Sequence, residues 1–309
     1  MSGSGVVWAT DVPIGPLTTY RVGGTARWSV TAHRVDDLVE LARLREGRSV
    51  LVVGKGSNLL VCDAGFDGVV VQLGEAFAGI EVPDGPGPSG GTERVVRAGG
   101  AAFLPVVARR TVAVGLTGFE WAVGVPGSIG GAVRMNAGGH GSDMSGSLVG
   151  VRLVDLGSGE DEEVPAADLH LAYRSSSLRD DQVVVAADLR LRDGDREAGE
   201  RELSEIVRWR REHQPGGQNA GSVFTNPQGD SAGRLIDAAG CRGLRAGTAE
   251  VSTKHANFIQ ADAGGSADDV FALMVEVARR VRDVHGVELH PETRLVGFPP
   301  FADAVAAAS

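Results

Sequence analysis

The stretch of this sequence best suited to chemistry is rich in glycine: residues 124–141 read GVPGSIGGAVRMNAGGHG. Glycine has no Cβ, so such a backbone can turn sharply and bring its N–H groups close to a ligand. N–H groups that converge in a turn bind phosphate oxygens. No Gly-Lys-Ser/Thr follows, and no clear dinucleotide fingerprint surrounds the stretch, so it is neither a P-loop nor an evident Rossmann loop. A glycine-rich connection between two strands of a crowded sheet is the alternative interpretation.

A second loop of the same kind lies upstream, at residues 54–58 (GKGSN). The apolar residues 50–53 predict a buried strand that opens into this loop. The loop then presents backbone donors and the Ser57 hydroxyl at the edge of a sheet, where phosphates bind. One such loop is weak support for a ligand, but two in one chain predict a single long ligand with a diphosphate, held from two sides.

Three polar side chains outside these loops are candidates for acting on a substrate. Arg174 lies among hydroxyl residues in AYRSSSL, before the predicted strand 183–192, and an ordinary surface arginine is an equally good interpretation. Ser222 lies in AGSVFTNP, where a serine among small residues is usually a turn former. Glu292 follows Pro291 in the predicted final strand, where a solvated glutamate is the commoner case.

Composition and motifs exclude several classes of protein. The chain of 309 residues has a formal net charge of -10 and no basic run, so neither nucleic acid nor an anionic membrane is expected as its main partner. No HExxH, zinc-ligand spacing or GxSxG is present, so we expect no metal and no hydrolase serine. Cys62 and Cys241 lie far apart, as reduced thiols do. No signal peptide or apolar run of about 20 residues is evident, so we expect a cytoplasmic protein.

Hydrophobic periodicity predicts a mixture of helices and strands in two or three domains. The clearest helix is 266–286, with Ser266 and Asp269 as a capping pair. Residues 79–82 and 94–100 predict a hairpin around the turn-rich segment 83–93, which we expect to be a solvent loop without function. The other predicted elements are helices at 35–47, 101–116, within 193–217 and from 232, and strands at 50–53, 68–74, 149–165, 183–192, 254–262 and 287–298.

Seven motifs, taken in chain order, carry a resemblance that covers residues 16–298. They are TTYRVGG, VGKGSNLL, GVPGSIGGAVRMNAGGHG, AYRSSSL, AGSVFTNP, KHANF and HPETRLVG. Each is unspecific alone, but together they closely resemble the UDP-N-acetylenolpyruvoylglucosamine reductase (MurB) family of flavoenzymes. Because no long insertion precedes AGSVFTNP, the chain is similar to the shorter, type II form of that family.

The resemblance implies an α+β fold: a two-lobed FAD-binding module of the vanillyl-alcohol-oxidase (PCMH) type, followed by a small α+β substrate-binding domain. Residues 1–72 would form the first FAD-binding lobe, to which the C-terminal strand 289–309 returns. Residues 73–208 would form the second lobe, and residues 209–288 the substrate-binding domain. The two glycine loops then form the cradle of the FAD diphosphate, in agreement with the interpretation from their residues alone.

The resemblance also implies the reaction. NADPH, through FAD, reduces the enolpyruvyl ether of UDP-N-acetylglucosamine to UDP-N-acetylmuramate, a peptidoglycan precursor. Hydride addition builds negative charge on the α-carbon and its carboxylate, which Arg174 can hold with two hydrogen bonds. Glu292 matches a family glutamate that, if protonated, donates to the same group, which requires a raised pKa. Ser222 matches the serine that protonates the α-carbon.

Binding residues follow from the same resemblance. The partner is a small nucleotide sugar, which we expect to be bound by a monomer or weak homo-oligomer, with substrate contacts at Asn226 and His255. The contacts implied for FAD lie near the N-terminus and in both glycine loops: Tyr20, Arg21, Gly23, Val53, Gly54, Lys55, Gly56, Ser57, Asn58, Leu59, Val125, Pro126, Gly127, Ser128, Gly130, Gly131, Ala132, Asn136 and Gly138.

Two positions depart from the family pattern. Thr225 stands where the family usually has lysine, and the central loop ends in GGHG (138–141), where Gly-Ala-Tyr-Gly is common. A MurB-like enzyme acting on a different enolpyruvyl or nucleotide-sugar substrate in secondary metabolism is therefore the alternative function. An FAD oxidase of the same fold and a flavin-binding protein without turnover are two further hypotheses.

Overall fold

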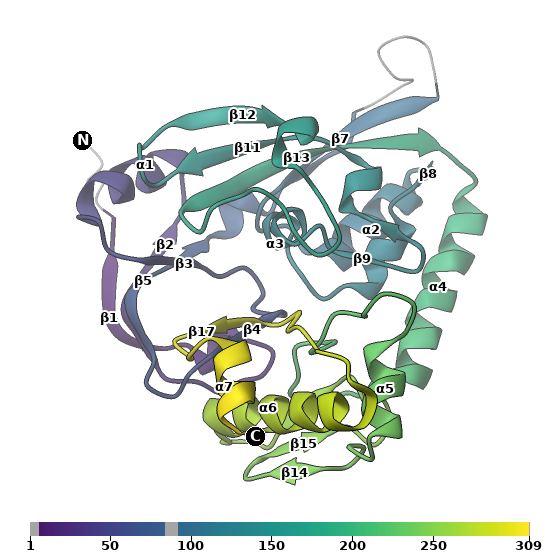
Figure 1. Cartoon of the computed structure of the whole chain (residues 1–309). Coiled ribbons are helices and arrows are strands. Elements are labelled where there is room, and N and C mark those ends of the chain that lie inside the picture. Colours follow the sequence, from purple (N-terminus) through teal and green to yellow (C-terminus); the bar gives the residue numbers. More distant parts are fainter. Residues whose placement is uncertain (1–5, 84–91, 309) are drawn as a thin grey trace. The chain divides into compact units, whose positions relative to one another are not determined.

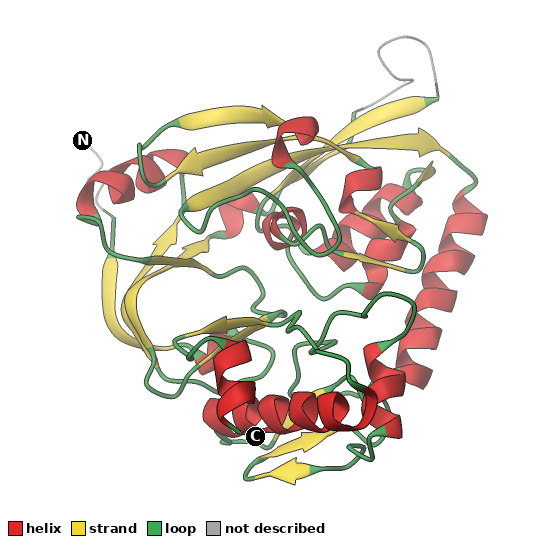
Figure 2. Ribbon diagram, in the orientation of Figure 1, coloured by secondary structure: helices red, strands yellow, loops and turns green. Residues whose placement is uncertain are grey.

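The computed structural model of the chain describes residues 6–83 and 92–308. The chain divides into two compact units, each made of segments that are discontinuous in sequence (Figure 1). The chain combines helices with sheets that are mainly antiparallel (Figure 2), so the predicted α+β class is confirmed. The first unit comprises Met1–Ala9, Trp28–Lys55 and Gly68–Arg210, and the second comprises Thr10–Arg27, Gly56–Asp67 and Arg211–Ser309. The predicted lobe boundaries at residues 72 and 208 stay a prediction.

The main sheet of the first unit is antiparallel, with the order β12-β11-β13-β7-β6 and with β8 paired to the end of β13. Pairing of β6 with β7 confirms the predicted hairpin, although most of the intervening segment 83–93 lies outside the described residues. The strands are β6 (Ile80–Glu81), β7 (Glu93–Gly99), β8 (Leu116–Thr117), β11 (Leu148–Asp155), β12 (Asp161–Pro165) and β13 (Gln182–Asp193).

Two helices of the first unit bring the glycine stretch onto this sheet. Helix α2 (Leu104–Ala113) buries Leu104, Val107 and Ala108, the spacing of one helix face, and Pro105 lies in its first turn. Helix α3 (Ile129–Arg134) packs on β13 through Ile129 and Val133. Helix α3 lies within the glycine stretch, so its packing fixes the middle of that stretch against the sheet. The short 3₁₀ helices are η1 (Gly15–Leu17), η2 (Glu75–Phe77), η3 (Glu120–Gly124), η4 (Met144–Gly146) and η5 (Ala166–Leu169).

A second sheet has the order β1-β2-β5-β3, and the boundary between the units passes through β1, β2 and β5. Helix α1 (Val35–Leu44) buries Leu38 and Leu41 in an apolar cluster with β3 and β5. The helix predicted at 35–47 and the strands predicted at 50–53 and 68–74 are therefore present. The remaining strands are β1 (Trp8–Pro13), β2 (Thr25–Ala32), β3 (Val50–Val52), β5 (Phe66–Leu73), and the short pair β9 (Gly138–Gly139) and β10 (Ser142–Asp143).

The second unit packs helix α6 (Ala267–His285) on a small antiparallel sheet of order β14-β15-β16. The Ser266 half of the predicted capping pair of α6 is confirmed: its hydroxyl accepts from the N–H of Asp269, and Gly286 ends the helix in the left-handed region. The Asp269 half is wrong, because its carboxylate accepts from the N–H and the hydroxyl of Thr248. The other elements of this unit are β4 (Leu59–Val61), β14 (Arg245–Ala246), β15 (Ala249–Val251), β16 (Ile259–Ala261), β17 (Arg294–Val296), α5 (Ala232–Ala238) and α7 (Phe301–Ala307). Helix α4 (Arg196–His213), the predicted charged helix, precedes them.

Two predicted strands are shorter in the structure, and helices α3 and α7 were not predicted. The strand expected at 254–262 is confined to β16, because the residues before it turn to contact segment 222–224. The final strand expected at 287–298 is confined to β17, which pairs in parallel with β4. Helix α7 was not predicted, and Phe301 at its start packs against Phe271 and Phe224. Of the described helices, none is long and apolar enough to cross a membrane.

Candidate active site

Within the first unit the two glycine loops lie against each other. A Cβ at Gly54 would overlap the hydroxyl oxygen of Ser128, so glycine at this position lets the loops approach. Ser128 pairs with Phe103 in an isolated antiparallel bridge, and the Lys55 ammonium lies 6.0 Å from the centroid of the Phe103 ring. Residues of two separate loops, each predicted to contact one ligand, are therefore neighbours.

The glycine stretch offers fewer free donors than its composition indicates. The N–H of Ile129 donates to the carbonyl of Ala102, and that of Gly130 donates to the carbonyl of Gly100, both at 2.9 Å. These N–H groups are already bonded to protein and cannot also serve an anion without breaking those bonds. At Gly131, in contrast, a Cβ would meet nothing nearer than the Ser128 hydroxyl at 3.6 Å, so the backbone there is open.

The second half of the upstream loop belongs to the second unit. Gly56 has φ +58, and a Cβ there would overlap the carbonyl oxygen of Leu17 and lie 2.6 Å from Cα of Thr18. Nδ2 of Asn58 donates to the carbonyl of Glu292 at 3.0 Å. This half of the loop therefore packs against the N-terminal segment and holds the backbone of a predicted catalytic residue.

Tyr20, a predicted cofactor contact, is completely buried in the core of the second unit. Its hydroxyl has no hydrogen-bond partner among the described residues, and burial raises its pKa far above the ordinary value, so the phenol is neutral. The whole residue is enclosed, so its evident role in the structure is packing, and its contact with a cofactor stays a prediction.

Arg174 is held in a strained turn beside the end of the glycine stretch. Buried Asn136 donates from Nδ2 to the carbonyl of Ala172 at 3.0 Å. Ala172 pairs with Ser175 in an isolated bridge, and Arg174 between them has φ +55, which non-glycine residues seldom adopt. Its Nη2 donates to the carbonyl of Gly138 at 3.0 Å. A strained backbone that aims a half-buried guanidinium favours a functional arginine over an ordinary surface one.

Backbone pairing brings Ser222 and Glu292 together in the second unit. The N–H of Glu292 donates to the carbonyl of Val223 at 2.8 Å, and Phe224 pairs with Pro291 in an isolated bridge. Two motifs that are distant in sequence thus form adjacent backbone segments. Arg174, the third predicted catalytic residue, belongs to the other unit.

Asn257 holds the Ser222 segment from the opposite side. Its Oδ1 accepts from the N–H of Phe224 at 3.0 Å, and its Nδ2 donates to the carbonyl of Phe224 at 2.8 Å. Its own carbonyl accepts from the N–H of Val223 at 2.9 Å. Asn257 lies in the KHANF motif, two residues after His255, but was not predicted as a site residue. Its burial and its partners are visible only in the structure.

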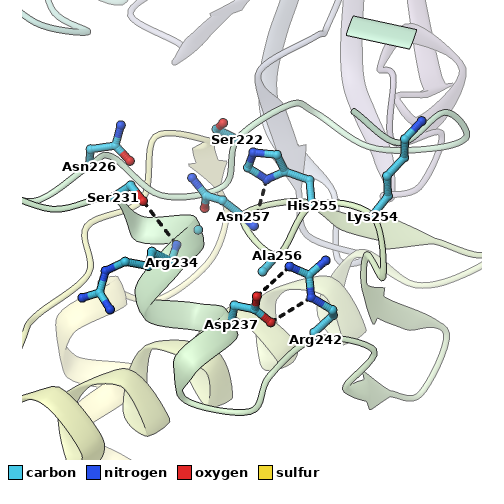
Figure 3. A pocket seen from close by; sticks show the side chains of 11 residues that line it. Ser222, Asn226, Ser231, Arg234, Asp237, Arg242, Lys254, His255, Ala256 and Asn257 are labelled. Atoms are coloured by element: carbon cyan, nitrogen blue, oxygen red, sulfur yellow. Dashed lines mark hydrogen bonds and ion pairs between the residues drawn. The ribbon is translucent and has the colours of Figure 1, made fainter. Parts of the chain in front are cut away.

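A polar cavity of about 340 Å³ lies within the second unit beside Ser222 (Figure 3). Three of its lining residues were predicted from the sequence: Ser222, Asn226 and His255. The rest are mostly polar or charged, so the cavity suits a polar ligand with negative charge. They are Ser231, Gly233, Arg234, Asp237, Arg242, Lys254, Ala256 and Asn257.

His255 is fixed in one orientation and one tautomer. Its Nδ1 accepts from the N–H of Asn257 at 3.2 Å, so the neutral ring carries its proton on Nε2. Phe258 packs edge-on with its centroid 4.8 Å away, and a Cβ on Gly233 would lie 3.3 Å from Cε1. Burial, and then the charge of Arg242, lower the pKa of His255. The ring is therefore a neutral hydrogen-bond donor at neutral pH.

Two arginine–aspartate pairs place charge on the cavity wall. Arg242 binds Asp237 through Nε and Nη2, both at 2.8 Å, and its Nη1 donates to the carbonyl of Thr253 at 2.7 Å. Arg234 binds Asp230 in the same two-pronged way, through Nε at 2.7 Å and through Nη2. The hydrogen bond from Arg234 lowers the pKa of Asp230 to about 2, so this pair stays charged at neutral pH. Neither pair was predicted, because no spacing in the sequence marks them.

The other predicted cofactor contacts are distributed over both units. Some have evident packing roles: a Cβ on Gly23 would lie 2.6 Å from the carbonyl oxygen of Val61. Their contact with a cofactor stays a prediction. Arg21, Gly23, Ser57 and Leu59 lie in the second unit, and Val53, Val125, Pro126, Gly127, Ala132 and Gly138 in the first.

Similar proteins agree with this arrangement over most of the chain. The UDP-N-acetylenolpyruvoylglucosamine reductase of Acidiphilium cryptum is 43% identical over 292 residues, covering 94% of this chain and 91% of the relative. That of Heliobacterium modesticaldum is 42% identical over 295 residues, covering 94% and 91%. The crystal structure of the Thermus caldophilus reductase (MurB) has a TM-score of 0.79 and 32% identity, covering 94% of this chain and 99% of that one.

Family models divide the chain in a way that identifies its class. Residues 27–164 match the FAD binding domain, so the chain is an FAD-binding flavoprotein. Residues 213–296, which include the polar cavity, match the C-terminal domain of UDP-N-acetylenolpyruvoylglucosamine reductase. The chain belongs to the UDP-N-acetylenolpyruvoylglucosamine reductase family. The resemblance found from its motifs is confirmed.

The residues of the glycine loops fit FAD. Gly54 and Ser128 bring the two loops into contact, Gly131 leaves open backbone beside that contact, and the exposed Lys55 adds a positive charge. Open backbone next to a cation is suited to a diphosphate.

Proposed function

We propose that this chain catalyses the NADPH-driven, FAD-dependent reduction of the enolpyruvyl ether of UDP-N-acetylglucosamine to UDP-N-acetylmuramate, in peptidoglycan precursor synthesis. The observation that carries the proposal is the 43% identity, along 94% of the chain, to a reductase named for that substrate. The polar cavity beside Ser222 supports it, because a nucleotide sugar is polar and negatively charged.

Ser222 is proposed to protonate the α-carbon of the substrate. A serine hydroxyl is a weak acid in water, so this role requires a fixed position and partial exclusion of solvent. The backbone bonds from Glu292 and Asn257 to residues 223–224 fix that position, and the half-buried side chain lines the cavity.

Arg174 is proposed to hold the substrate carboxylate as negative charge develops on it. A guanidinium is always charged and can donate two parallel hydrogen bonds to a carboxylate, which suits an enolate-like group. The strained turn and the bond to Gly138 limit the directions that this guanidinium can take. Glu292 is half-buried just before β17, and its N–H donates to the carbonyl of Val223; its carboxyl is proposed to donate a second hydrogen bond when protonated.

Bound FAD, once reduced by NADPH, supplies the hydride in this proposal. The protein residues bind and orient: Gly54, Lys55 and Ser128 are proposed to contact the FAD diphosphate, and Asn226 and His255 to contact the nucleotide sugar. The neutral His255 donates from Nε2 without adding charge, which leaves the charge of the cavity to its arginines and lysine.

The alternative of a different nucleotide-sugar or enolpyruvyl substrate was raised by Thr225. The N–H and the hydroxyl of Thr225 both donate to the carbonyl of His290, at 3.0 Å and 3.3 Å, and Thr225 is not among the described residues that line the cavity. This position therefore joins two backbone segments. The absence of lysine at this position is therefore weak support for a different substrate.

Three further parts of the proposal concern setting and organisation. We place the enzyme in the cytoplasm, which its two buried free thiols, Cys62 and Cys241, support. We propose that it is a monomer or weak homo-oligomer without nucleic-acid partners, and that lobes 1–72 and 73–208 bind FAD while 209–288 bind substrate.

The test uses the purified holoprotein without oxygen. One equivalent of NADPH should bleach the flavin, and UDP-N-acetylenolpyruvoylglucosamine should restore its colour, with UDP-N-acetylmuramate identified by mass spectrometry. A flavin that this substrate leaves reduced but oxygen rapidly reoxidises would contradict the proposal in favour of an oxidase. A flavin that NADPH does not reduce would favour a protein without turnover.

A further inference from the structure

We propose that Asn58 is a positioning residue for Glu292: its side-chain amide completes the backbone pairing beside Glu292 and so fixes where the Glu292 carboxyl is presented. The family resemblance implies Asn58 only as a cofactor contact. The inference rests on the proposed function for the role of Glu292, which donates to the substrate carboxylate when protonated. Asn58 and Glu292 both belong to the second unit.

The strands that carry these two residues are neighbours. Strands β4 and β17 lie side by side and pair in parallel, starting with Leu59 opposite Arg294 (Figure 1). One residue earlier, the same register puts Asn58 opposite Thr293. A regular parallel ladder would give Asn58 two bonds, one from its carbonyl to the N–H of Arg294 and one from its N–H to the carbonyl of Glu292. The first bond is present, at 3.1 Å.

The side chain of Asn58 makes the second bond in place of the backbone. Its Nδ2 donates at 3.0 Å to the carbonyl of Glu292, the acceptor that the backbone N–H would use. Within residues 6–83 and 92–308, that backbone N–H donates to no protein atom. An asparagine amide can stand in for a peptide N–H because it carries the same kind of donor. The exchange leaves the backbone N–H of Asn58 available to a ligand of the loop 54–58.

The peptide groups of Glu292 are therefore held on both sides. Its N–H donates to the carbonyl of Val223 at 2.8 Å, and its carbonyl accepts from Asn58. Val223 in turn donates its N–H to the carbonyl of Asn257 at 2.9 Å. Four segments that are distant in sequence are thus bonded in a row. This backbone limits the directions of the Glu292 carboxyl relative to Ser222, which directly precedes Val223.

A direct contact with the FAD diphosphate is the alternative role for the Asn58 side chain. Such a contact would require the NH₂ group to face a phosphate, because this group is the only donor of the side chain. The structure directs Nδ2 to the carbonyl of Glu292. The other polar atom, Oδ1, is an acceptor and would repel a phosphate oxygen. The orientation of the amide therefore favours positioning of Glu292.

The first experiment follows both half-reactions of the FAD-loaded protein by stopped-flow absorbance. Asn58→Asp keeps the size of the side chain but replaces the donor by an acceptor, so it should slow reoxidation by the enolpyruvyl substrate about thirtyfold. Flavin reduction by NADPH and FAD content should be unchanged. In steady state, kcat should fall while the KM for that substrate changes less than about twofold. Loss of FAD, equal slowing of both half-reactions, or reoxidation as fast as in wild type would overturn the inference.

Gln260→Glu is the matched control. Nε2 of Gln260 also donates to a backbone carbonyl of the second unit, that of Gly216, at 2.8 Å. The same exchange of an amide for a carboxylate there should leave both half-reactions unchanged. Slowing of reoxidation as large as in Asn58→Asp would show that the effect is not specific to the pairing beside Glu292.

A double-variant cycle tests whether Asn58 acts through Glu292. Asn58→Ala, which adds no charge, should slow reoxidation about tenfold in the wild-type background and not at all in the Glu292→Ala background. A further tenfold loss in the second background would mean that Asn58 acts on another group, and the positioning role would be wrong.

Hydrogen exchange separates this inference from the proposed function. Asn58→Asp should speed amide exchange in residues 290–296, because the carbonyl of Glu292 loses its donor, and this measurement needs no substrate. If exchange is faster but wild type does not turn over the enolpyruvyl substrate, the positioning stands and the proposed reaction fails. If wild type turns over that substrate and Asn58→Asp changes neither exchange nor reoxidation, the reaction stands and the positioning fails.

Discussion

The glycine loops of the first unit and the cavity of the second are built from different parts of the chain. At the loops, Gly54 can approach Ser128 because glycine has no side chain. A ligand bound by these loops would therefore contact backbone groups. At the cavity, Asn226 and His255 each have two polar side-chain atoms. One of the two is already hydrogen-bonded to the protein backbone, and the other remains for a ligand. A backbone site is sensitive to any added atom, whereas a side-chain site is sensitive to the loss of a partner.

The largest effect that this comparison predicts is at Ser222. Ser222→Ala should leave flavin reduction by NADPH unchanged and slow reoxidation by the enolpyruvyl substrate by about a thousandfold, because the general acid is lost from the side-chain site only. Stopped-flow absorbance of the flavin measures both half-reactions. Ser204→Ala, at an exposed serine of α4, is the control, and equal loss in both half-reactions would contradict the assignment.

Arg174→Lys should lower kcat by about a hundredfold with flavin content unchanged. Lysine keeps the charge but loses the planar two-pronged donor and the bond to Gly138. Steady-state turnover and the ratio of flavin to protein measure the two quantities. Arg196→Lys is a control at an exposed arginine paired with Glu200, and an unchanged kcat in Arg174→Lys would make Arg174 an ordinary charged residue.

Asn257→Ala should lower the free energy of unfolding by about 2 kcal/mol, because it leaves the buried N–H and C=O of Phe224 without partners. Urea titration followed by circular dichroism measures the loss. Asn257→Asp keeps the acceptor for the N–H and loses the donor to the carbonyl, so it should lie between wild type and the alanine variant. Stability equal to that of wild type in both variants would show that the hydrogen bonds between Asn257 and Phe224 do not stabilise the fold.

The smallest effect concerns pH. The pKa of His255 is lowered in the folded chain, so between that value and its ordinary 6.5 the unfolded chain binds more protons. The free energy of unfolding therefore falls as pH drops through this window and is not further reduced by His255 below it. His255→Gln should make the fall between about pH 7.5 and about pH 5 smaller, as urea titrations at both values would measure. A fall as large as in wild type would place the sensitivity on other groups.

Local signals made part of the fold predictable. The N-cap of α6 uses the hydroxyl of Ser266, a residue type that marks helix starts in sequence, and Gly286 directly follows the last residue of this helix. Helix α3 was missed because glycine disfavours helices, and only packing on β13 stabilises one there. Helix α7 was missed because Phe301 finds its partners, Phe271 and Phe224, only in the folded chain.

The candidate site, like the fold, could be predicted only where local sequence motifs mark its residues. Ser222, His255 and the glycine loops lie in motifs that can be read from sequence. The hydrogen bonds of Asn257 to residues 223–224 join positions more than thirty apart, and no local pattern indicates them. The bond from the side chain of Asn58 to the carbonyl of Glu292 likewise joins distant positions, a fact that only coordinates give.

The most direct test of the division between backbone and side-chain sites is a crossed titration of deflavinated protein with FAD and with UDP. Gly54→Val should weaken FAD binding by at least about tenfold and leave UDP binding unchanged, whereas Asn226→Ala should do the reverse. Gly139→Ala, at a glycine whose Cβ would meet no atom within 4 Å, should change neither. If either of the first two variants weakened both ligands by the same factor, the two sites would not be separate and the account would be wrong.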